Sequence, residues 1–138
     1  MTKKFTHQAL LLTESKPLIF TAMSKHIFYY RLFISKFVLE QDCVPVNPFT
    51  SFDYFMLDTV PRDIVRAANN NLLMRSDQLW VFGPISDGVL VEIKIARSQG
   101  KIIRFFKIEN ASTIIECKIG DLMIEDDVVA FKQEIAQL

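Results

Sequence analysis

The chain alternates between short runs of apolar residues and longer segments in which apolar residues recur every three or four positions. Runs rich in β-branched and aromatic residues are typical of buried strands, whereas the wider spacing is typical of amphipathic helices. On this pattern we predict strands over residues 16–22, 43–46, 77–82, 101–106 and 113–118, and helices over residues 24–41, 61–75, 89–99 and 125–137.

Strands and helices alternate from residue 16 to residue 106, and this order predicts an α/β fold. Alternation of this kind joins parallel strands through right-handed crossovers. We therefore expect a doubly wound parallel sheet of about five strands, with helices on both faces. The pattern after residue 106 is less regular. We interpret residues 1–15 as an N-terminal extension and residues 16–138 as a single domain, because 138 residues are typical of one domain.

The composition narrows the classes of function. Half of the residues are hydrophobic, which is enough for a full core. Basic and acidic residues number 16 each, so the chain lacks the overall positive field of a dedicated nucleic-acid-binding protein, and we expect no nucleic acid polymer as a partner. The cysteines Cys43 and Cys117 and the histidines His7 and His26 match no metal-ligand spacing. We expect neither a metal site nor a cofactor.

The apolar run near the N-terminus, residues 9–12, is shorter than the roughly 7–15 residues of a secretory signal core. No stretch approaches the ~20 apolar residues of a membrane-spanning helix. Two cysteines far apart in the sequence suit the reducing cytoplasm. We therefore expect a cytoplasmic protein that does not engage a membrane.

Several familiar motifs are absent from the sequence. No glycine-rich dinucleotide fingerprint follows the first predicted strand, where Thr21-Ala22-Met23-Ser24 stands instead. A P-loop and a nucleophile elbow are also absent. The chemistry that remains belongs to carboxylates.

Three carboxylates, Asp77, Asp87 and Glu92, cluster around the third predicted strand and the helix that follows it. In open α/β sheets ligands bind at the carboxyl ends of the strands, and Glu92 in the first turns of that helix would face the crevice. A carboxylate at this position acts as a nucleophile, as a base or only as a partner of the helix dipole. Asp77 could equally bind nearby backbone N–H groups, and Asp87 could cap the helix.

Aromatic residues gather in a predicted loop after the second strand, residues 49–60, which includes Phe49, Phe52 and Tyr54. Rings at the ligand edge of a sheet stack on planar ligands such as nucleobases, but these rings could also belong to the core. Trp80 lies in the middle of a strand, where we expect it to be core.

Residues at the starts of two predicted helices could bind a phosphate group. Ser24, Lys25, Ser86 and Gly88 offer hydroxyls, a cation and backbone N–H groups there, although the alternative is ordinary helix capping. His26 lies in the first turn of the first helix, where it either contacts an anionic group or is a solvated surface residue.

The ordered set Asp77-Gln78-Leu79-Trp80-Val81-Phe82-Gly83, then Asp87-Gly88, then Glu92 with Ala96 and Ser98-Gln99-Gly100-Lys101 resembles the nucleoside 2-deoxyribosyltransferase family. In that family the nucleophilic glutamate stands in a Glu-x-x-x-Ala stretch ahead of a Gly-Lys that opens the next strand. Asn47-Pro48 after the second strand also fits. The resemblance covers residues 17–106 and is sharpest over residues 77–101.

The resemblance implies a flavodoxin-like sheet of five strands and retaining transfer at the anomeric carbon of a nucleoside or nucleotide. Glu92 would be the nucleophile that displaces the base and forms a glycosyl ester, and Asp87 would contact the sugar hydroxyls or the leaving base. It also implies a homo-oligomer, a dimer or larger. The implied substrate contacts are Thr21, Ala22, Met23, Ser24, Asn47, Phe49, Tyr54, Asn69, Asp77, Ser86 and Gly88.

The chain departs from the family pattern in one place that matters for chemistry. An acid near the end of the second helix is replaced within Asn69-Asn70-Asn71, and an amide cannot supply a proton as a carboxylic acid can. Three readings therefore stand. The protein is a glycosyl transferase or hydrolase that uses Glu92, a non-catalytic nucleotide-binding module or sensor on the same fold, or an interaction protein whose aromatic loop is an interface.

Overall fold

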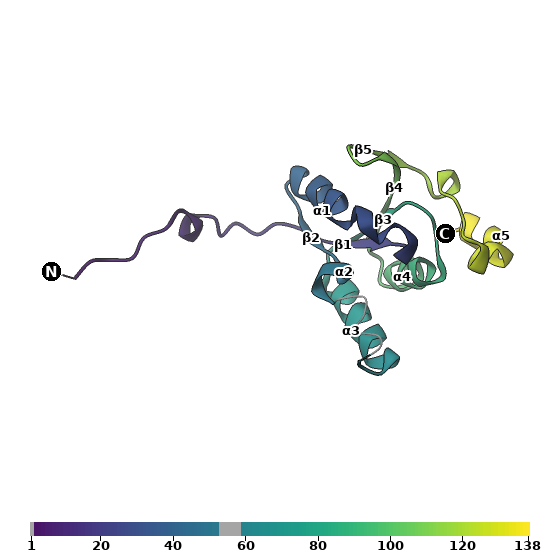
Figure 1. The fold of residues 1–138 in the computed structure, drawn as a ribbon, viewed down its shortest axis with the longest axis horizontal. Helices are drawn as coiled ribbons and strands as arrows, with labels where there is room; N and C mark the ends of the chain where they lie inside the picture. The colour runs from purple at the N-terminus through teal and green to yellow at the C-terminus, as the bar shows by residue number, and fades with distance from the viewer. Residues whose placement is uncertain (1, 53–58) are drawn as a thin grey trace.

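The computed structural model of the chain describes residues 2–52 and 59–138. Its centre is a five-stranded sheet in the order β2-β1-β3-β4-β5 (Figure 1). The strands are β1 (Leu18–Met23), β2 (Val44–Val46), β3 (Gln78–Phe82), β4 (Ile102–Asn110) and β5 (Thr113–Cys117). The α-helices are α1 (Arg31–Glu40), α2 (Pro48–Ser51), α3 (Arg62–Arg75), α4 (Asp87–Ser98) and α5 (Lys132–Ala136).

Strand β1 pairs in parallel with β2 on one side and with β3 on the other, and β3 pairs in parallel with β4. This order is the flavodoxin-like one, so the predicted α/β fold of about five strands is confirmed. The expectation of a wholly parallel sheet is wrong for β5, which pairs antiparallel with β4. Only Ala111 and Ser112 separate these two strands. Two residues can form a hairpin, whereas a parallel crossover needs a dozen or more.

Alternating strand residues divide the core into two layers. Phe20, Leu79 and Val81 belong to the layer that holds the buried residues of α4, while Ile19 and Trp80 belong to the layer that holds those of α1. Figure 1 shows α1 and α4 on opposite sides of the strands. Trp80 is buried, as predicted, and its indole N–H donates to Gln78 Oε1 at 2.9 Å.

Two predicted helices begin in a tighter form than expected. The helix predicted from Ser24 starts as the 3-10 helix η2 (Lys25–Tyr30) and becomes α1 at Arg31, with non-helical dihedral angles at Ile27. The predicted terminal helix is divided into the 3-10 helix η5 (Asp126–Phe131) and α5. Aspartate and valine, which open η5, have low helix propensity, and this composition favours a short, irregular start.

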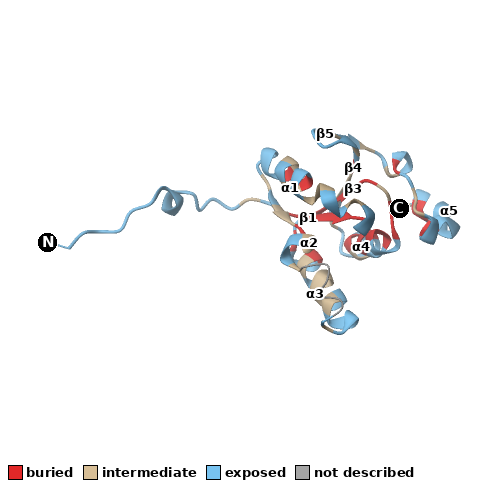
Figure 2. Cartoon of the chain, in the orientation of Figure 1, coloured by how far each residue is buried: buried red, intermediate tan, exposed pale blue. Residues whose placement is uncertain are grey.

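Two parts of the chain lie apart from the core. The segment before β1 extends away from the sheet and contains only a short 3-10 helix, η1 (Gln8–Leu11), with no buried residue. Helix α3 projects from the other elements, and Leu73 is its one buried residue (Figure 2). The predicted aromatic loop instead opens with α2, where Pro48 occupies the first turn. Its residues 53–58, including Tyr54, lie outside the described part of the chain.

Within the described residues, no helix combines the length and the apolar character that a membrane crossing needs.

Candidate functional site

A cavity of about 1170 Å³ opens at the carboxyl ends of the parallel strands. Its walls include Met23, which ends β1, Pro48, which follows β2, and Ser86, which follows β3. The chain turns to opposite sides of β1 to form β2 and β3, and this reversal of strand order is where open α/β sheets bind ligands. The volume is slightly above the roughly 300–1,000 Å³ that is usual for small-molecule sites.

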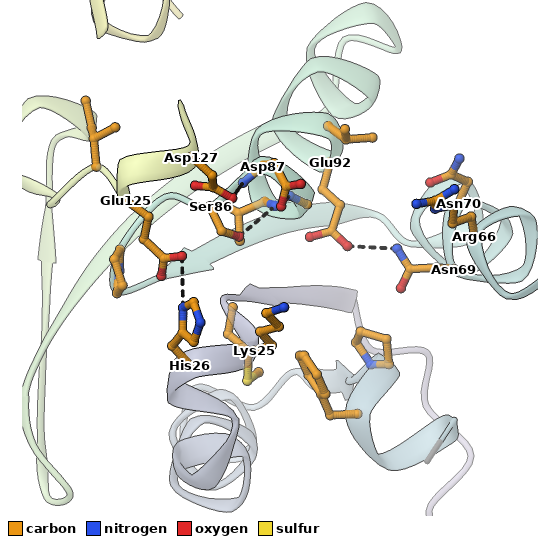
Figure 3. Close-up of a pocket in the computed structure, with 18 of the residues that line it drawn as sticks. Lys25, His26, Arg66, Asn69, Asn70, Ser86, Asp87, Glu92, Glu125 and Asp127 are labelled. Atoms are coloured by element: carbon orange, nitrogen blue, oxygen red, sulfur yellow. Dashed lines mark hydrogen bonds and ion pairs between the residues drawn. The ribbon is translucent and has the colours of Figure 1, made fainter. Parts of the chain in front are cut away.

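Glu92 reaches the cavity from the second turn of α4. The residues around it, Val89, Ile93 and Ala96, are buried against the sheet, and they fix the orientation of the helix. Glu92 itself is only 8 % exposed. Asn69 on α3 donates a hydrogen bond from Nδ2 to Glu92 Oε2 at 2.8 Å (Figure 3). Among the described residues, this hydrogen bond from the Asn69 side chain is the only one that the Glu92 carboxylate accepts.

Burial raises the pKa of the Glu92 carboxyl to about 7, while the hydrogen bond from Asn69 opposes the rise. Removal from water disfavours the charged form, and a donated N–H favours it. A carboxyl group of this kind exchanges its proton near neutral pH. Such groups in clefts mark functional sites, because nucleophiles and general bases need tuned acidity.

The N-terminus of α4 is capped by side chains of the protein itself. Val89 N–H donates to Ser86 Oγ at 3.3 Å, and Gly88 N–H donates to Asp87 Oδ1 at 2.7 Å. Asp87 N–H donates to Asp127 Oδ2 at 3.3 Å. Backbone donors at a helix start can bind phosphate only where they are free. For Ser86 and Gly88 the capping alternative is therefore the one that the structure supports.

One wall of the cavity, formed by residues near the C-terminus, was not predicted from the sequence. Residues 122–128, the wall segment, dock beside the loop after β3 through an isolated parallel bridge between Ile85 and Ile124. Ile85 N–H donates to Met123 O at 2.8 Å, and Glu125 N–H donates to Ile85 O at 2.9 Å. The wall segment contributes Met123, Ile124, Glu125, Asp126 and Asp127 to the cavity lining. Its only sequence signal was the acidic run at 125–127, which is equally typical of a solvated surface.

A histidine and a carboxylate meet at the rim of this wall. His26 Nδ1 lies 3.1 Å from Glu125 Oε1, and the His26 side chain is 67 % exposed, against 16 % for Glu125. Ser24 is the N-cap of η2, and its Oγ accepts a hydrogen bond from His26 N–H at 3.2 Å. The sequence had left open whether His26 is a solvated residue or one that meets an anion, and the structure gives it an anionic partner within the chain.

The remaining lining is aromatic and basic. Phe49 and Phe52, at the start and end of α2, lie on the wall formed by the chain after β2. Lys25 on η2 and Arg66 on α3 are its basic residues, and Arg66 also pairs with Asp63 at 3.1 Å. The lining also includes five carboxyl groups, those of Asp87, Glu92, Glu125, Asp126 and Asp127. The cavity is thus richer in acids than in bases.

The structure brings seven of the predicted site residues to the cavity: Met23, Phe49, Asn69, Ser86, Asp87, Gly88 and Glu92. Asp77 lies away from the cavity, at the amino end of the sheet, because this residue precedes β3. There its carboxylate accepts from Leu18 N–H at 2.7 Å, and the residue does not line this cavity.

Four further predicted contacts are absent from the cavity wall for reasons of packing. Thr21 and Ala22 are fully buried inside β1, where Thr21 Oγ1 donates to the carbonyl of Val46. Ser24 is also buried as the cap of η2. Asn47 is 3 % exposed and caps α2 by accepting from Phe49 N–H at 3.0 Å. These polar groups are used by the fold.

Within residues 2–52 and 59–138, no three His, Cys, Asp or Glu side chains are grouped so that they could hold a metal ion. Cys43 and Cys117 are free cysteines.

The fold and the cavity define an α/β domain with a large cavity at the switch point of a flavodoxin-like sheet. Residues 21–106 match the family model described as "Domain of unknown function (DUF7768)", and the chain belongs to this family. A 2-desoxiribosyltransferase from Leishmania mexicana has a similar structure, with a TM-score of 0.53 and 15% sequence identity over 87% of this chain and 97% of that chain. At this identity the likeness concerns the fold. No curated protein matches the chain.

Proposed function

We propose that the protein acts on the glycosidic bond of a nucleoside, as an N-glycosyl transferase or hydrolase with Glu92 as its nucleophile. The observation that carries the proposal is the buried Glu92 carboxylate, which faces a large cavity at the strand ends and has a pKa of about 7. The fold that the chain shares with a 2-desoxiribosyltransferase is consistent with this chemistry.

In the proposed reaction, an oxygen of the Glu92 carboxylate attacks the anomeric carbon and the bond to the base breaks, with its electron pair leaving on the base. The product is a glycosyl ester on Glu92, which a second base or water then resolves. Asn69 would hold Oε2 and leave Oε1 for the attack. Asp87, at the first position of α4, would contact the sugar hydroxyls.

The lining favours a nucleoside over a nucleoside 5′-phosphate. Phe49 and Phe52 offer faces on which a planar base can stack. A phosphate would meet the occupied N-terminus of α4 and the carboxylates of Asp87 and Asp127. Like charges at short range are costly, and the neutral sugar hydroxyl of a nucleoside avoids that cost. Lys25 and Arg66 also line the cavity, where they could make polar contacts with the base, although Arg66 already pairs with Asp63.

The test is release of free base from a panel of ribonucleosides, deoxyribonucleosides and their 5′-monophosphates, followed by chromatography. We expect the wild-type protein to release base from nucleosides and Glu92→Gln to release none, because an amide is too weak a nucleophile for this step. Glu109→Gln is the matched control, since Glu109 is exposed on β4 and does not line the cavity. Its base release should equal that of the wild type. Addition of a second base distinguishes transfer from hydrolysis.

Either of two results would contradict the proposal. Full turnover by a folded Glu92→Gln protein would exclude Glu92 as the nucleophile. If the wild type binds nucleosides, as seen in a shift of Tm, and releases no base from any of them, the non-catalytic binding module becomes the function. Asn69 in place of an acid is the feature that would favour that outcome.

A further inference from the structure

The proposed reaction leaves one proton without a source. When the bond between the sugar and the base breaks, the base departs with an electron pair and must be protonated to leave as a neutral molecule. The residue of α3 that touches Glu92 is Asn69, whose amide cannot give up a proton for this purpose. A proton donor must therefore come from another wall of the cavity.

The pair His26–Glu125 lies across the cavity from Glu92. Figure 3 shows His26 and Glu125 on one side and Glu92 with Asn69 on the other, with the cavity between them. His26 Nδ1 lies 3.1 Å from Glu125 Oε1. An ionised carboxylate only accepts hydrogen bonds, so an ionised Glu125 favours the form of His26 that carries a hydrogen on Nδ1. The other ring nitrogen, Nε2, is then left for a ligand or for water. Histidine is also the side chain that most often transfers protons in enzymes.

Both residues of the pair are held in place by hydrogen bonds that their backbone N–H groups donate. Ser24 is 1 % exposed, and its Oγ accepts from His26 N–H and lies 3.5 Å from His26 Nδ1. Glu125 is fixed through its own N–H, which donates to Ile85 O at 2.9 Å in the bridge to the wall segment. Two elements of the chain therefore orient one ring, while the exposure of that ring lets it exchange protons with water.

We infer that His26 is the general acid and base of the site and that Glu125 positions it; the inference rests on the proposed function. In the first step the Glu92 oxygen bonds to the anomeric carbon, the bond to the base breaks, and the base nitrogen takes the proton from Nε2 of the His26 imidazolium. In the second step Nε2 removes a proton from the incoming base or water, which bonds to the anomeric carbon and releases the Glu92 carboxylate. Each step is balanced, and the pair returns to its starting state.

Several charged groups line the cavity together with His26. They are Lys25 on η2, Arg66 on α3, Asp87 and Glu92 on α4, and Glu125, Asp126 and Asp127 on the wall segment. Reaction requires an ionised Glu92 and a protonated His26 together, so the dependence of kcat/KM on pH should be bell-shaped for a nucleoside substrate.

The experiment compares His26→Gln with the wild type on two substrates, a natural deoxynucleoside and 4-nitrophenyl 2-deoxyriboside. A nitrophenolate leaves without a proton, so the two substrates differ in their need for an acid. We expect His26→Gln to lower kcat/KM on the nucleoside by roughly 10²–10⁴-fold and to change it little on the nitrophenyl substrate. The falling limb of the pH profile should disappear, so that activity on the nucleoside rises to a plateau. Glu125→Gln should lower kcat on the nucleoside with a smaller change in KM.

His7→Gln is the matched control, since His7 lies in the exposed N-terminal segment and does not line the cavity. It should behave as the wild type on both substrates. An equal loss on both substrates, or no loss on the nucleoside, would overturn the role of His26. If the wild type cleaves neither substrate, or if Glu92→Gln cleaves the nitrophenyl substrate as well as the wild type does, the proposed function itself fails.

Discussion

At the scale of single residues, the main feature of the molecule is a carboxyl group placed where its charge is unfavourable. Glu92 is 8 % exposed and, among the described residues, receives one hydrogen bond, from Asn69. Its pKa of about 7 lies well above its ordinary value of 4.5 because burial favours the neutral form. The nucleophilic role that we propose for Glu92 and the stability of the fold therefore make opposite demands on this residue.

Stability should show this conflict directly. The folded protein binds the Glu92 proton more tightly than the unfolded chain does, so the favourable contribution is fully present below about pH 4.5 and is lost as the pH rises through about 7. Glu92→Gln removes the loss and should raise the free energy of unfolding at pH 8 by roughly 2–3 kcal/mol, and by much less at pH 5. Thermal or urea unfolding at the two pH values measures the difference. A gain that is equal at both values would contradict the raised pKa.

The hydrogen bond from Asn69 can be tested by titration. It favours the charged form of Glu92, so Asn69→Ala should move the pKa of Glu92 further upward. The ¹³C chemical shift of the Glu92 carboxyl carbon, followed by NMR from pH 4 to pH 10 in roughly half-unit steps, reports this change. Asn71→Ala is the matched control, because Asn71 is exposed and donates to Ala67 O within α3. An unchanged or lowered pKa in Asn69→Ala would exclude the amide as a determinant.

At the scale of elements, the N-terminus of α4 is occupied by side chains of the protein, whereas the sequence left open that it binds a phosphate group. The sequence allowed it to be a phosphate cradle, and in the structure a residue about forty positions further along the chain, Asp127, accepts from its first N–H group. A protein carboxylate thus stands where the oxygen of a bound anion would stand. The wall segment therefore occupies the position at which an anionic ligand would contact this helix.

Removal of that carboxylate should change the ligands that the site accepts. We expect inorganic phosphate at millimolar concentration to leave the Tm of the wild type unchanged and to raise that of Asp127→Ala, because a ligand of the native state alone stabilises it. Asp126→Ala is the matched control. Asp126 lines the same cavity but, within the described part of the chain, makes no hydrogen bond to α4. An equal rise in both variants would point to the loss of negative charge in general and not to a freed helix terminus.

At the scale of the whole molecule, local patterns predicted most of the fold. The apolar runs and the helical spacing gave β1–β4, and the α/β class followed from their alternation. The fifth strand, β5, was also predicted, but its antiparallel direction was not, because that direction depends on the length of a turn and not on the strand itself. Asp77 lies away from the cavity because it precedes β3, and this could have been inferred from the order of the residues, since ligands bind at the carboxyl ends of the strands.

The cavity was predicted only in part, and the missing part has a physical explanation. Glu92 lies on the helix after β3 and Phe49 lies directly after β2, so their convergence could be expected from the predicted strand ends, whereas Asn69, in the middle of α3, was named only through the family resemblance. The contact between His26 and Glu125 joins residues that are 99 positions apart, and no periodic pattern records such a contact. The domain boundary at residue 16, the homo-oligomer and the cytoplasmic location stay predictions.

The bridge between Ile85 and Ile124 also has a consequence for the order in which the protein becomes competent. The wall segment follows all five strands along the chain, so every strand can pair before this segment docks. A chain whose sheet has formed and whose wall segment is undocked lacks Glu125 beside His26 and Asp127 at the start of α4. Local opening of this one segment would therefore leave the sheet folded and the cavity without two of its contacts.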